Sequence, residues 1–275
     1  MASRLPGAAG FEEACREIHD ACSQPRFLGL LLALRSPSER QQIRATYRAT
    51  FGEDLAGTLQ RIVVANQENE LCKLLYLWTL EPADRDAIIA QEAVDGGMTV
   101  AGYQTLVEVF TRRKQNQLFF TKQAYMARFR RNLEQDMVTE PAHPYQRARN
   151  VLCFSLFLSS AVLLTRLSCN TVSVQALKTN GSGEFEESLR VVVKCIHTPS
   201  KYYSKLLQRS MQCTAPDKRL VARAIFGSDD VGIDEIKSVF KSSYGRNLAD
   251  FIHETLPESD YRDFLVAVAT ASATS

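Results

Sequence analysis

Basic side chains gather in one part of the 275-residue chain, between Asp95 and Asn150. This segment holds nine basic and five acidic residues, a balance of +4, whereas Phe11 to Val94 holds nine basic and thirteen acidic residues, a balance of −4. Guanidinium and ammonium groups attract phosphate, so the segment is the most favourable face for an anionic phosphate partner, although a solvated helix face is typical of the same pattern. Its cations include Arg112, Arg113, Lys114, Arg128, Arg130, Arg131, Arg147 and Arg149. The net charge of the whole chain, only +2, does not indicate a nucleic-acid partner.

The sequence lacks the short motifs on which many catalytic sites are built. It has no Gly-x-x-x-x-Gly-Lys phosphate loop, no His-Glu-x-x-His and no Gly-x-Ser-x-Gly. Asp229-Asp230-Val231-Gly232 has the Asp-x-x-Gly form of some GTP sites, but chance explains it better when no phosphate loop is present. Histidines are scattered along the chain, as His19, His143, His197 and His253. We therefore expect a protein that is not an enzyme.

The cysteines point to a reducing compartment. There are seven of them, an odd number with no Cys-x-x-Cys pair, which favours neither a disulfide framework nor a zinc site. Four lie in apolar helical patterns and are expected to fill cores, namely Cys15, Cys72, Cys153 and Cys195. The stretch from Met1 to Gly10 lacks the long apolar run of a signal peptide. The uncharged run from Val151 to Thr165 is shorter than the ~20 residues that span a bilayer, so a buried helix is expected there.

One pattern of aromatic residues occurs three times and indicates helical repeats. Two aromatic residues and a leucine are spaced four apart in each copy, which predicts that all three share one helical face. A glycine or a polar break, then Asp or Asn, follows the second aromatic residue, so one helix should end and another begin there. The copies are Tyr47-Phe51-Leu55, Tyr125-Phe129-Leu133 and Phe240-Tyr244-Leu248. Repetition of this kind favours an array of helical modules that meets a partner, rather than one catalytic pocket.

Local signals give the helix boundaries of the first module. A helix from Phe11 to Leu34 should be interrupted at Ser23-Gln24-Pro25, because proline fits the first turn of a new helix. The next should begin after Ser36, with a serine cap, proline and an acidic first turn. Asp54 should cap the helix after that, and Glu70 to Leu80 should form a buried fifth helix.

The spacing of the three copies is uneven. Tyr47 and Tyr125 are 78 positions apart, while Tyr125 and Phe240 are 115 positions apart. The segment from Ser159 to Ser182 lacks a clean helical stripe, although a closing helix follows from Phe185 to Cys195. We therefore expect a third module that is incomplete, with exposed apolar surface and a lower stability than a complete array.

Several stretches resemble repeats of the annexin family, and together they cover nearly the whole chain outside Ser159 to Gln175. The stretches that resemble the first repeat are Arg35-Ser36, Gln41-Gln42-Ile43-Arg44, Tyr47, Phe51-Gly52-Glu53-Asp54-Leu55 and Leu77 to Ala87. The junction of the third and fourth repeats is resembled by Gly181 to Glu186, Val193-Lys194-Cys195 and Lys201-Tyr202-Tyr203. The fourth repeat is resembled by Tyr244 to Leu248 and Asp260 to Leu265. The Val-Lys-Cys and Lys-Tyr-Tyr pieces are similar to plant members.

The resemblance implies an all-α fold, an annexin-like array of four five-helix repeats with the third repeat incomplete. The expected bounds are 11–84, 85–158, 159–198 and 199–270. Annexins bind anionic phospholipid through calcium, in loops of the form Met-Lys-Gly-x-Gly-Thr that are completed by an acidic residue before the last helix of the repeat. The chemistry is suitable, since calcium takes about six to eight oxygens and a glycine-rich turn offers backbone carbonyls.

Compared with that pattern, the second repeat keeps the best calcium site. The implied ligands are Val94, Gly96, Gly97, Met98 and Glu140; a helix-linking turn with Glu140 as a surface acid is the alternative. In the first repeat the loop has shrunk to the stretch from Ala21 to Arg26, and Ile62 stands at the position of the acidic residue. In the third repeat Asn180 stands at the position of the acidic residue. A weak fourth-repeat site would use Met211 to Asp217 with Glu254 or Glu258.

The expected function is therefore calcium-dependent phospholipid binding, with calcium as the cofactor and an anionic membrane surface as the partner. The protein is expected to be cytoplasmic and peripheral at the plasma membrane or other internal membranes. The alternative is a calcium-independent lipid or protein interaction scaffold whose calcium sites have decayed.

Overall fold

The structure is a computed structural model that describes residues 7–96, 100–138, 184–212 and 216–271. These residues form α-helices joined by turns, and no strand occurs among them, which confirms the predicted all-α class. The chain divides into two compact units, unit 1 with residues 1–81 and 203–275 and unit 2 with residues 82–202. No helix in the described part of the chain is both long and apolar enough to cross a membrane. The apolar run from Val151 to Thr165 lies outside the described residues.

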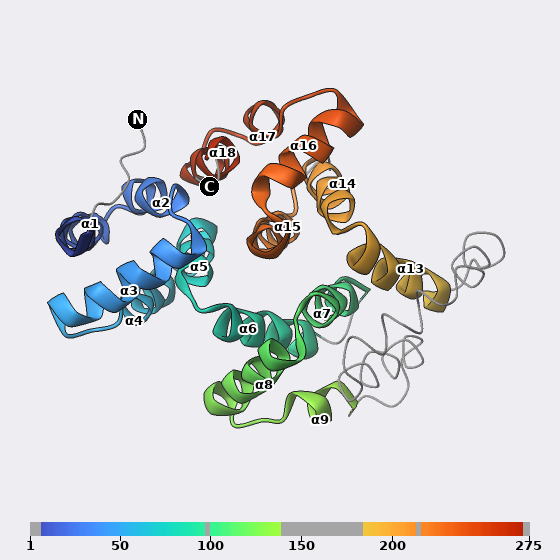
Figure 1. Ribbon diagram of the computed structural model, residues 1–275, viewed down its shortest axis with the longest axis horizontal. Coiled ribbons are helices and arrows are strands. Elements are labelled where there is room, and N and C mark those ends of the chain that lie inside the picture. The colour runs from blue at the N-terminus through green and yellow to red at the C-terminus, as the bar shows by residue number, and fades with distance from the viewer. Residues whose placement is uncertain (1–6, 97–99, 139–183, 213–215, 272–275) are drawn as a thin grey trace. The chain divides into compact units, whose positions relative to one another are not determined.

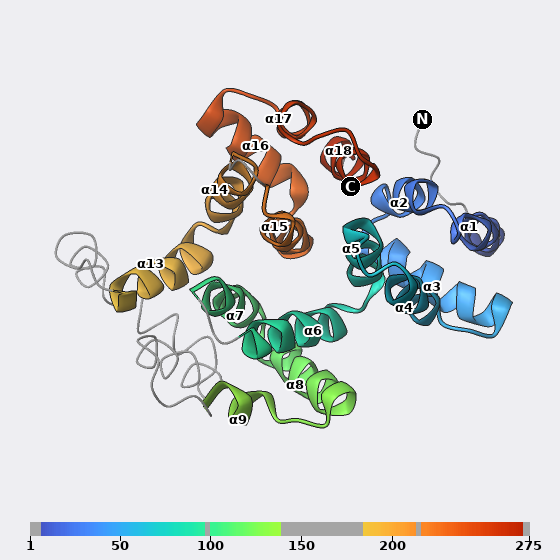
Figure 2. The same cartoon turned by 180° about the vertical axis from the view of Figure 1, so that it is seen from behind.

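Unit 1 combines helices from both ends of the chain (Figure 1). Helices α2 and α18 pack side by side, as do α4 and α5, and the view from behind shows the same neighbours (Figure 2). Its helices are α1 (Gly7–Ala21), α2 (Pro25–Ala33), α3 (Pro37–Phe51), α4 (Leu55–Ala65), α5 (Glu70–Thr79), α15 (Lys218–Val231), α16 (Ile233–Tyr244), α17 (Leu248–Thr255) and α18 (Asp260–Thr270), and α14 (Pro199–Met211) belongs to it from Tyr203 onward.

Unit 2 is built around an apolar core between five helices. Helix α6 packs on both α7 and α8, and α7 also packs on α13. Buried members of this core include Tyr103, Leu106, Tyr125 and Val192. The helices of the unit are α6 (Pro82–Asp95), α7 (Val100–Arg112), α8 (Gln115–Phe129), α9 (Leu133–Val138) and α13 (Glu184–His197). Helix α13 confirms the predicted closing helix, whereas the segment expected to be short, 159–182, lies outside the described residues.

The predicted helix signals of the first module are confirmed. The Ser36 hydroxyl accepts a hydrogen bond from the Glu39 N–H at 3.3 Å, and the Glu39 carboxylate accepts one from the Ser36 N–H at 2.8 Å. This reciprocal cap, with Pro37 in the first turn, explains where α3 begins. Asp54 caps α4 by accepting a hydrogen bond from the Ala56 N–H at 3.3 Å.

The repeated aromatic pairs lie within single helices, but the leucines do not. Ring centroids are 4.6 Å apart for Tyr47 and Phe51, 5.1 Å for the pair in α8 and 4.9 Å for the pair in α16. Leu55, Leu133 and Leu248 are buried first residues of the next helices, so the prediction of one helical face is wrong for them. The chain turns in between because the residue after each aromatic pair has a positive φ, which ends the helix.

That turn gives the first prediction. The positive φ is 73° at Gly52 and 70° at Gly245, but at the equivalent position after α8 an arginine, Arg130, has φ 57°. A side chain disfavours this backbone region, so Arg130→Gly should raise the free energy of unfolding by about 0.5–1 kcal/mol and Gly52→Ala should lower it by about 1 kcal/mol. A Cβ at Gly52 would meet nothing within 4 Å, so the change would report the backbone alone. Urea unfolding followed by circular dichroism measures both, and equal stability of Gly52→Ala and the parent protein would contradict the account.

Buried thiols fill the cores as the sequence predicts. Cys15 and Cys72 are buried in unit 1 and Cys195 in unit 2, while Cys153 lies outside the described residues. The Cys15 thiol donates to the Ile43 carbonyl at 3.3 Å, and burial raises the pKa of this thiol to about 11. Such a group stays protonated and unreactive at neutral pH.

Asp54 also makes unit 1 sensitive to acid. Its two carboxylate oxygens accept hydrogen bonds from Arg44, at 2.7 Å from Nε and 2.6 Å from Nη2, and these bonds hold the pKa of the carboxyl below its usual value. A lowered pKa means that the stabilisation is present above the unfolded pKa of about 3.9 and is lost as the pH falls through the folded pKa. Asp54→Asn keeps a capping oxygen, so it should unfold with a smaller loss of stability between pH 6 and pH 3 than the parent protein. Urea midpoints across this range test it, with the exposed Glu258→Gln as control; equal acid sensitivity of Asp54→Asn and the parent would count against it.

Candidate metal centre

Two of the five predicted calcium ligands lie in the described residues, at the end of helix α6. Val94 is half-buried in the last turn, and Gly96 follows the helix, where its N–H donates to the Glu92 carbonyl at 3.1 Å. Gly97, Met98 and Glu140 lie outside the described residues, so the full ligand set remains a prediction.

The backbone at the carboxyl end of α6 is suited to binding a cation. The carbonyl end of a helix carries partial negative charge, and its last carbonyls are free to point outward. A Cβ on Gly96 would lie only 3.0 Å from the Glu92 carbonyl oxygen, so a residue without a side chain fits here. Backbone carbonyls at Val94 and Gly96 are ligands of the type that calcium takes from a glycine-rich turn. The described residues therefore fit the implied ion through their backbone.

The carboxylate of Asp95, which immediately precedes Gly96 in the sequence, is already paired. Asp95 Oδ1 lies 2.8 Å from Arg131 Nη1, and the Gln91 amide donates to its other oxygen. Arg131 Nε also lies 2.8 Å from Asp136 Oδ2, which accepts a hydrogen bond from the Tyr125 hydroxyl at 2.7 Å. One guanidinium thus joins the end of α6 to α9, and its hydrogen bond to Asp95 raises the pKa of Arg131. The sequence does not reveal this role of Arg131, because nothing local relates position 131 to position 95.

Tyr125 takes part in the same network from the buried side of α8. Burial raises the pKa of its hydroxyl above the usual value, and its hydrogen bond to Asp136 acts in the same direction. The hydroxyl therefore stays protonated and serves as a donor. Together these contacts tie the last residue of α6 to α8 and α9.

The carboxylates considered for a fourth-repeat site are engaged or widely exposed. Glu254 forms an ion pair with Arg246, and Glu258 lies 4.0 Å from Arg262 with 93% of its side chain exposed. Met211 is buried, and positions 213–215 lie outside the described residues. Across the described ranges, no group of three or more His, Cys, Asp or Glu side chains is placed to hold a metal ion.

The shortened loop of the first repeat is closed by its own hydrogen bonds. The Cys22 N–H donates to the His19 carbonyl at 3.2 Å, and the Gln24 N–H donates to the Ala21 carbonyl at 2.8 Å. Ile62, at the position where the family has its acid, is a half-buried apolar residue of α4. This turn therefore offers a tight connection between α1 and α2 in place of an open loop.

The basic segment is less available to phosphate than its composition predicts. Arg113 is buried against Asp86, Lys122 pairs with Glu134, and Arg128 lies 3.7 Å from Asp84. The acids that neutralise these cations come from α6 and α9. The described part of this segment, up to residue 138, therefore does not form a continuous cationic face. Lys114 and Arg130 are exposed at the two ends of α8.

Known proteins with similar sequences and structures are annexins. The chain is 26% identical to annexin Gh1 of Gossypium hirsutum over 284 residues, covering 87% of each chain, and 26% identical to annexin D7 of Arabidopsis thaliana over 290 residues, covering 88% of each chain. Among solved structures, calcium-bound annexin (Sm)1 superposes with a TM-score of 0.73 at 16% identity, covering 96% of this chain and 92% of that one. No family model matches the chain. Given the likeness to plant annexins along most of the sequence, together with the shared all-helical fold, the protein belongs to the annexin family.

Proposed function

We propose that this annexin binds anionic phospholipid membranes with the help of calcium, as a peripheral protein of the cytoplasm and without enzymatic activity. Family membership supports the proposal, and so does the turn after α6, where Gly96 and the carbonyl end of the helix suit a cation. The ion would be held by the carbonyls of Val94, Gly96, Gly97 and Met98 and by the Glu140 carboxylate. Calcium bound there supplies a positive charge with open coordination positions for a lipid phosphate oxygen.

The protein's own residues prepare the turn for this role. Arg131 fixes Asp95, so the end of α6 is held before any ion arrives. The same ion pair removes Asp95 as a ligand, which leaves Glu140 as the carboxylate on which the site depends. We also propose the repeat bounds 11–84, 85–158, 159–198 and 199–270, with calcium binding concentrated in the second repeat and the third repeat incomplete.

A calcium-independent scaffold for lipid or protein is the second candidate. The closed turn of the first repeat and the ion pair of Glu254 with Arg246 favour it, because both features remove possible calcium ligands. Calcium titration followed by calorimetry separates the two candidates. Heat of binding that disappears in Glu140→Gln and persists in Glu258→Gln supports the first, and no heat in the parent protein supports the second.

A further inference from the structure

Helix α8 presents three large apolar side chains to solvent. Phe119 is 56% exposed, Phe120 is 55% exposed and Met126 is 45% exposed, although the opposite side of the same helix is buried through Leu118 and Tyr125. The Phe119 and Phe120 rings meet edge to face with their centroids 5.8 Å apart. A helix that is apolar on both sides has a second surface to cover, so this exposed side marks a contact with a partner.

The spacing gathers the exposed residues into one stripe. Positions 119, 123 and 126 are separated by four and three residues, which places them along one face of α8. The stripe therefore runs from Phe119 through Gln123 to Met126, and Arg130 follows at the position that ends the helix. We call these residues, together with Phe120, the α8 face.

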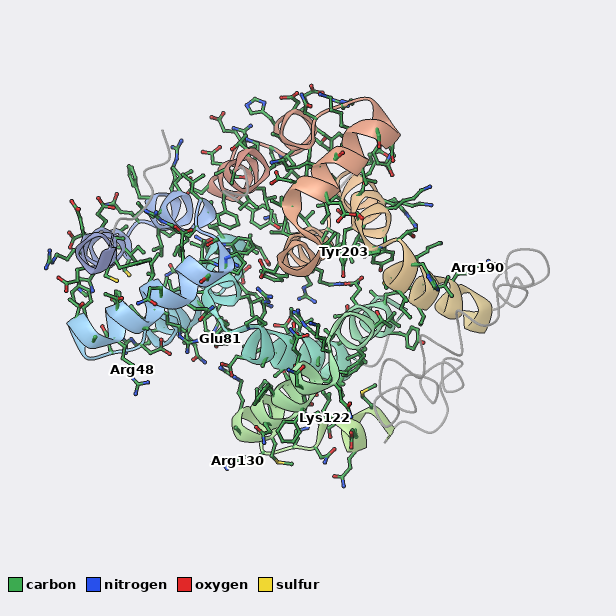
Figure 3. The ribbon with its side chains drawn as sticks, viewed as in Figure 1. Arg48, Glu81, Lys122, Arg130, Arg190 and Tyr203 are labelled. Atoms are coloured by element: carbon green, nitrogen blue, oxygen red, sulfur yellow. The ribbon has the colours of Figure 1, made fainter. Side chains whose placement is uncertain are left out.

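The charged residues of α8 and its two ends all have one sign. From Lys114 to Arg131 the chain has five basic residues and no acidic residue. Neighbouring elements neutralise three of the five, through Glu134 to Lys122, through Asp84 to Arg128 and through Asp95 and Asp136 to Arg131. Lys114 and Arg130, the remaining two, are exposed, and Figure 3 shows Arg130 projecting outward at the end of α8.

From these observations we propose that the α8 face inserts into the interface of an anionic membrane without calcium. Aromatic side chains are favoured at the headgroup level of a bilayer, and cations beside them are attracted by anionic lipid. The residues of the α8 face include two aromatic rings and the exposed Arg130 but no carboxylate. The proposal extends the membrane binding proposed above but does not depend on calcium.

Sedimentation of the full chain with phosphatidylserine-containing vesicles in a calcium chelator tests this contact. The parent protein should bind, and Phe119→Ala/Phe120→Ala should reduce the partition coefficient by about tenfold or more, because two aromatic rings no longer enter the interface. Arg130→Gly should reduce it by about fivefold even though it relieves the backbone at φ 57°. High salt should weaken binding, and vesicles of phosphatidylcholine alone should bind less.

Phe27→Ala is the matched control. Phe27 lies on α2 of unit 1 and is 59% exposed. The Phe27→Ala variant therefore removes the same kind of side chain at an exposure similar to that of Phe119 and Phe120. The proposal is overturned if the parent does not bind in chelator, if the α8 variant binds like the parent, or if Phe27→Ala loses as much. A lower mass of the α8 variant in solution, with unchanged vesicle binding, would also overturn it and assign the face to a second copy of the chain. Glu140→Gln tests the calcium site separately from the α8 face, because this variant should lose only the calcium-stimulated part of vesicle binding.

Discussion

Replacing Asp86 with alanine is expected to lower the free energy of unfolding by about 3–5 kcal/mol. Asp86 accepts two hydrogen bonds from Arg113, at 2.5 Å from Nε and 3.1 Å from Nη2, and the two side chains are only 6% and 7% exposed. Removing the acid takes away both hydrogen bonds and the negative charge beside a buried guanidinium. The cost of burying that guanidinium without Asp86, rather than the net strength of the pair, sets the size of the effect.

Asp84→Ala is the control, two positions earlier on the same helix. Asp84 is one-third exposed and lies 3.7 Å from Arg128, so its loss should cost less than about 1 kcal/mol. Urea unfolding followed by circular dichroism compares the two. A cost for Asp86→Ala as small as that for Asp84→Ala would refute the role of the buried pair. The double variant Asp86→Leu/Arg113→Met should recover much of the stability, because it removes both charges together.

Trp78→Ala is expected to cost about 3–5 kcal/mol as well, through a different mechanism. The Trp78 ring is buried in unit 1, edge to face with Phe264 at 5.8 Å, and the Arg40 guanidinium lies 3.9 Å from the ring centroid. Its indole N–H donates to the Leu32 carbonyl at 3.2 Å. Alanine would leave a large cavity, remove the indole hydrogen bond to the Leu32 carbonyl, which keeps the one from the Arg35 N–H at 3.2 Å, and take the aromatic partner from Arg40.

The milder Trp78→Phe separates these contributions. Phenylalanine keeps a ring beneath Arg40 and loses the indole donor, so it should cost about 1–3 kcal/mol. Thermal unfolding followed by circular dichroism gives the order parent, Trp78→Phe, Trp78→Ala. Equal melting temperatures for the parent and Trp78→Ala would show that this ring is not part of a packed core.

The sequence predicts the structure best where the signal is local. The Ser36 cap, the Asp54 cap and the positive-φ turn at Gly52 all follow from neighbours within a few positions, and the structure confirms them. The single-face prediction for Leu55 was wrong because a spacing of four was continued across a turn that ends the helix. A helical period carries information only as far as the helix itself extends.

Long-range pairing is the part that the sequence could not reveal. By composition Arg113 is one of the cations available to phosphate, yet Asp86, which accepts its hydrogen bonds, lies 27 positions earlier and only the fold brings the two together. Arg131 and Asp95 are 36 positions apart, so the sequence does not reveal their pairing either. Composition counts charges, but packing decides which of them face solvent.

Vesicle sedimentation with and without calcium tests the central claim most directly. The parent protein should bind phosphatidylserine vesicles in chelator through the α8 face and bind more in calcium, and Glu140→Gln should lose the calcium-stimulated part while keeping the rest. Identical binding of the parent protein in calcium and in chelator would contradict the account.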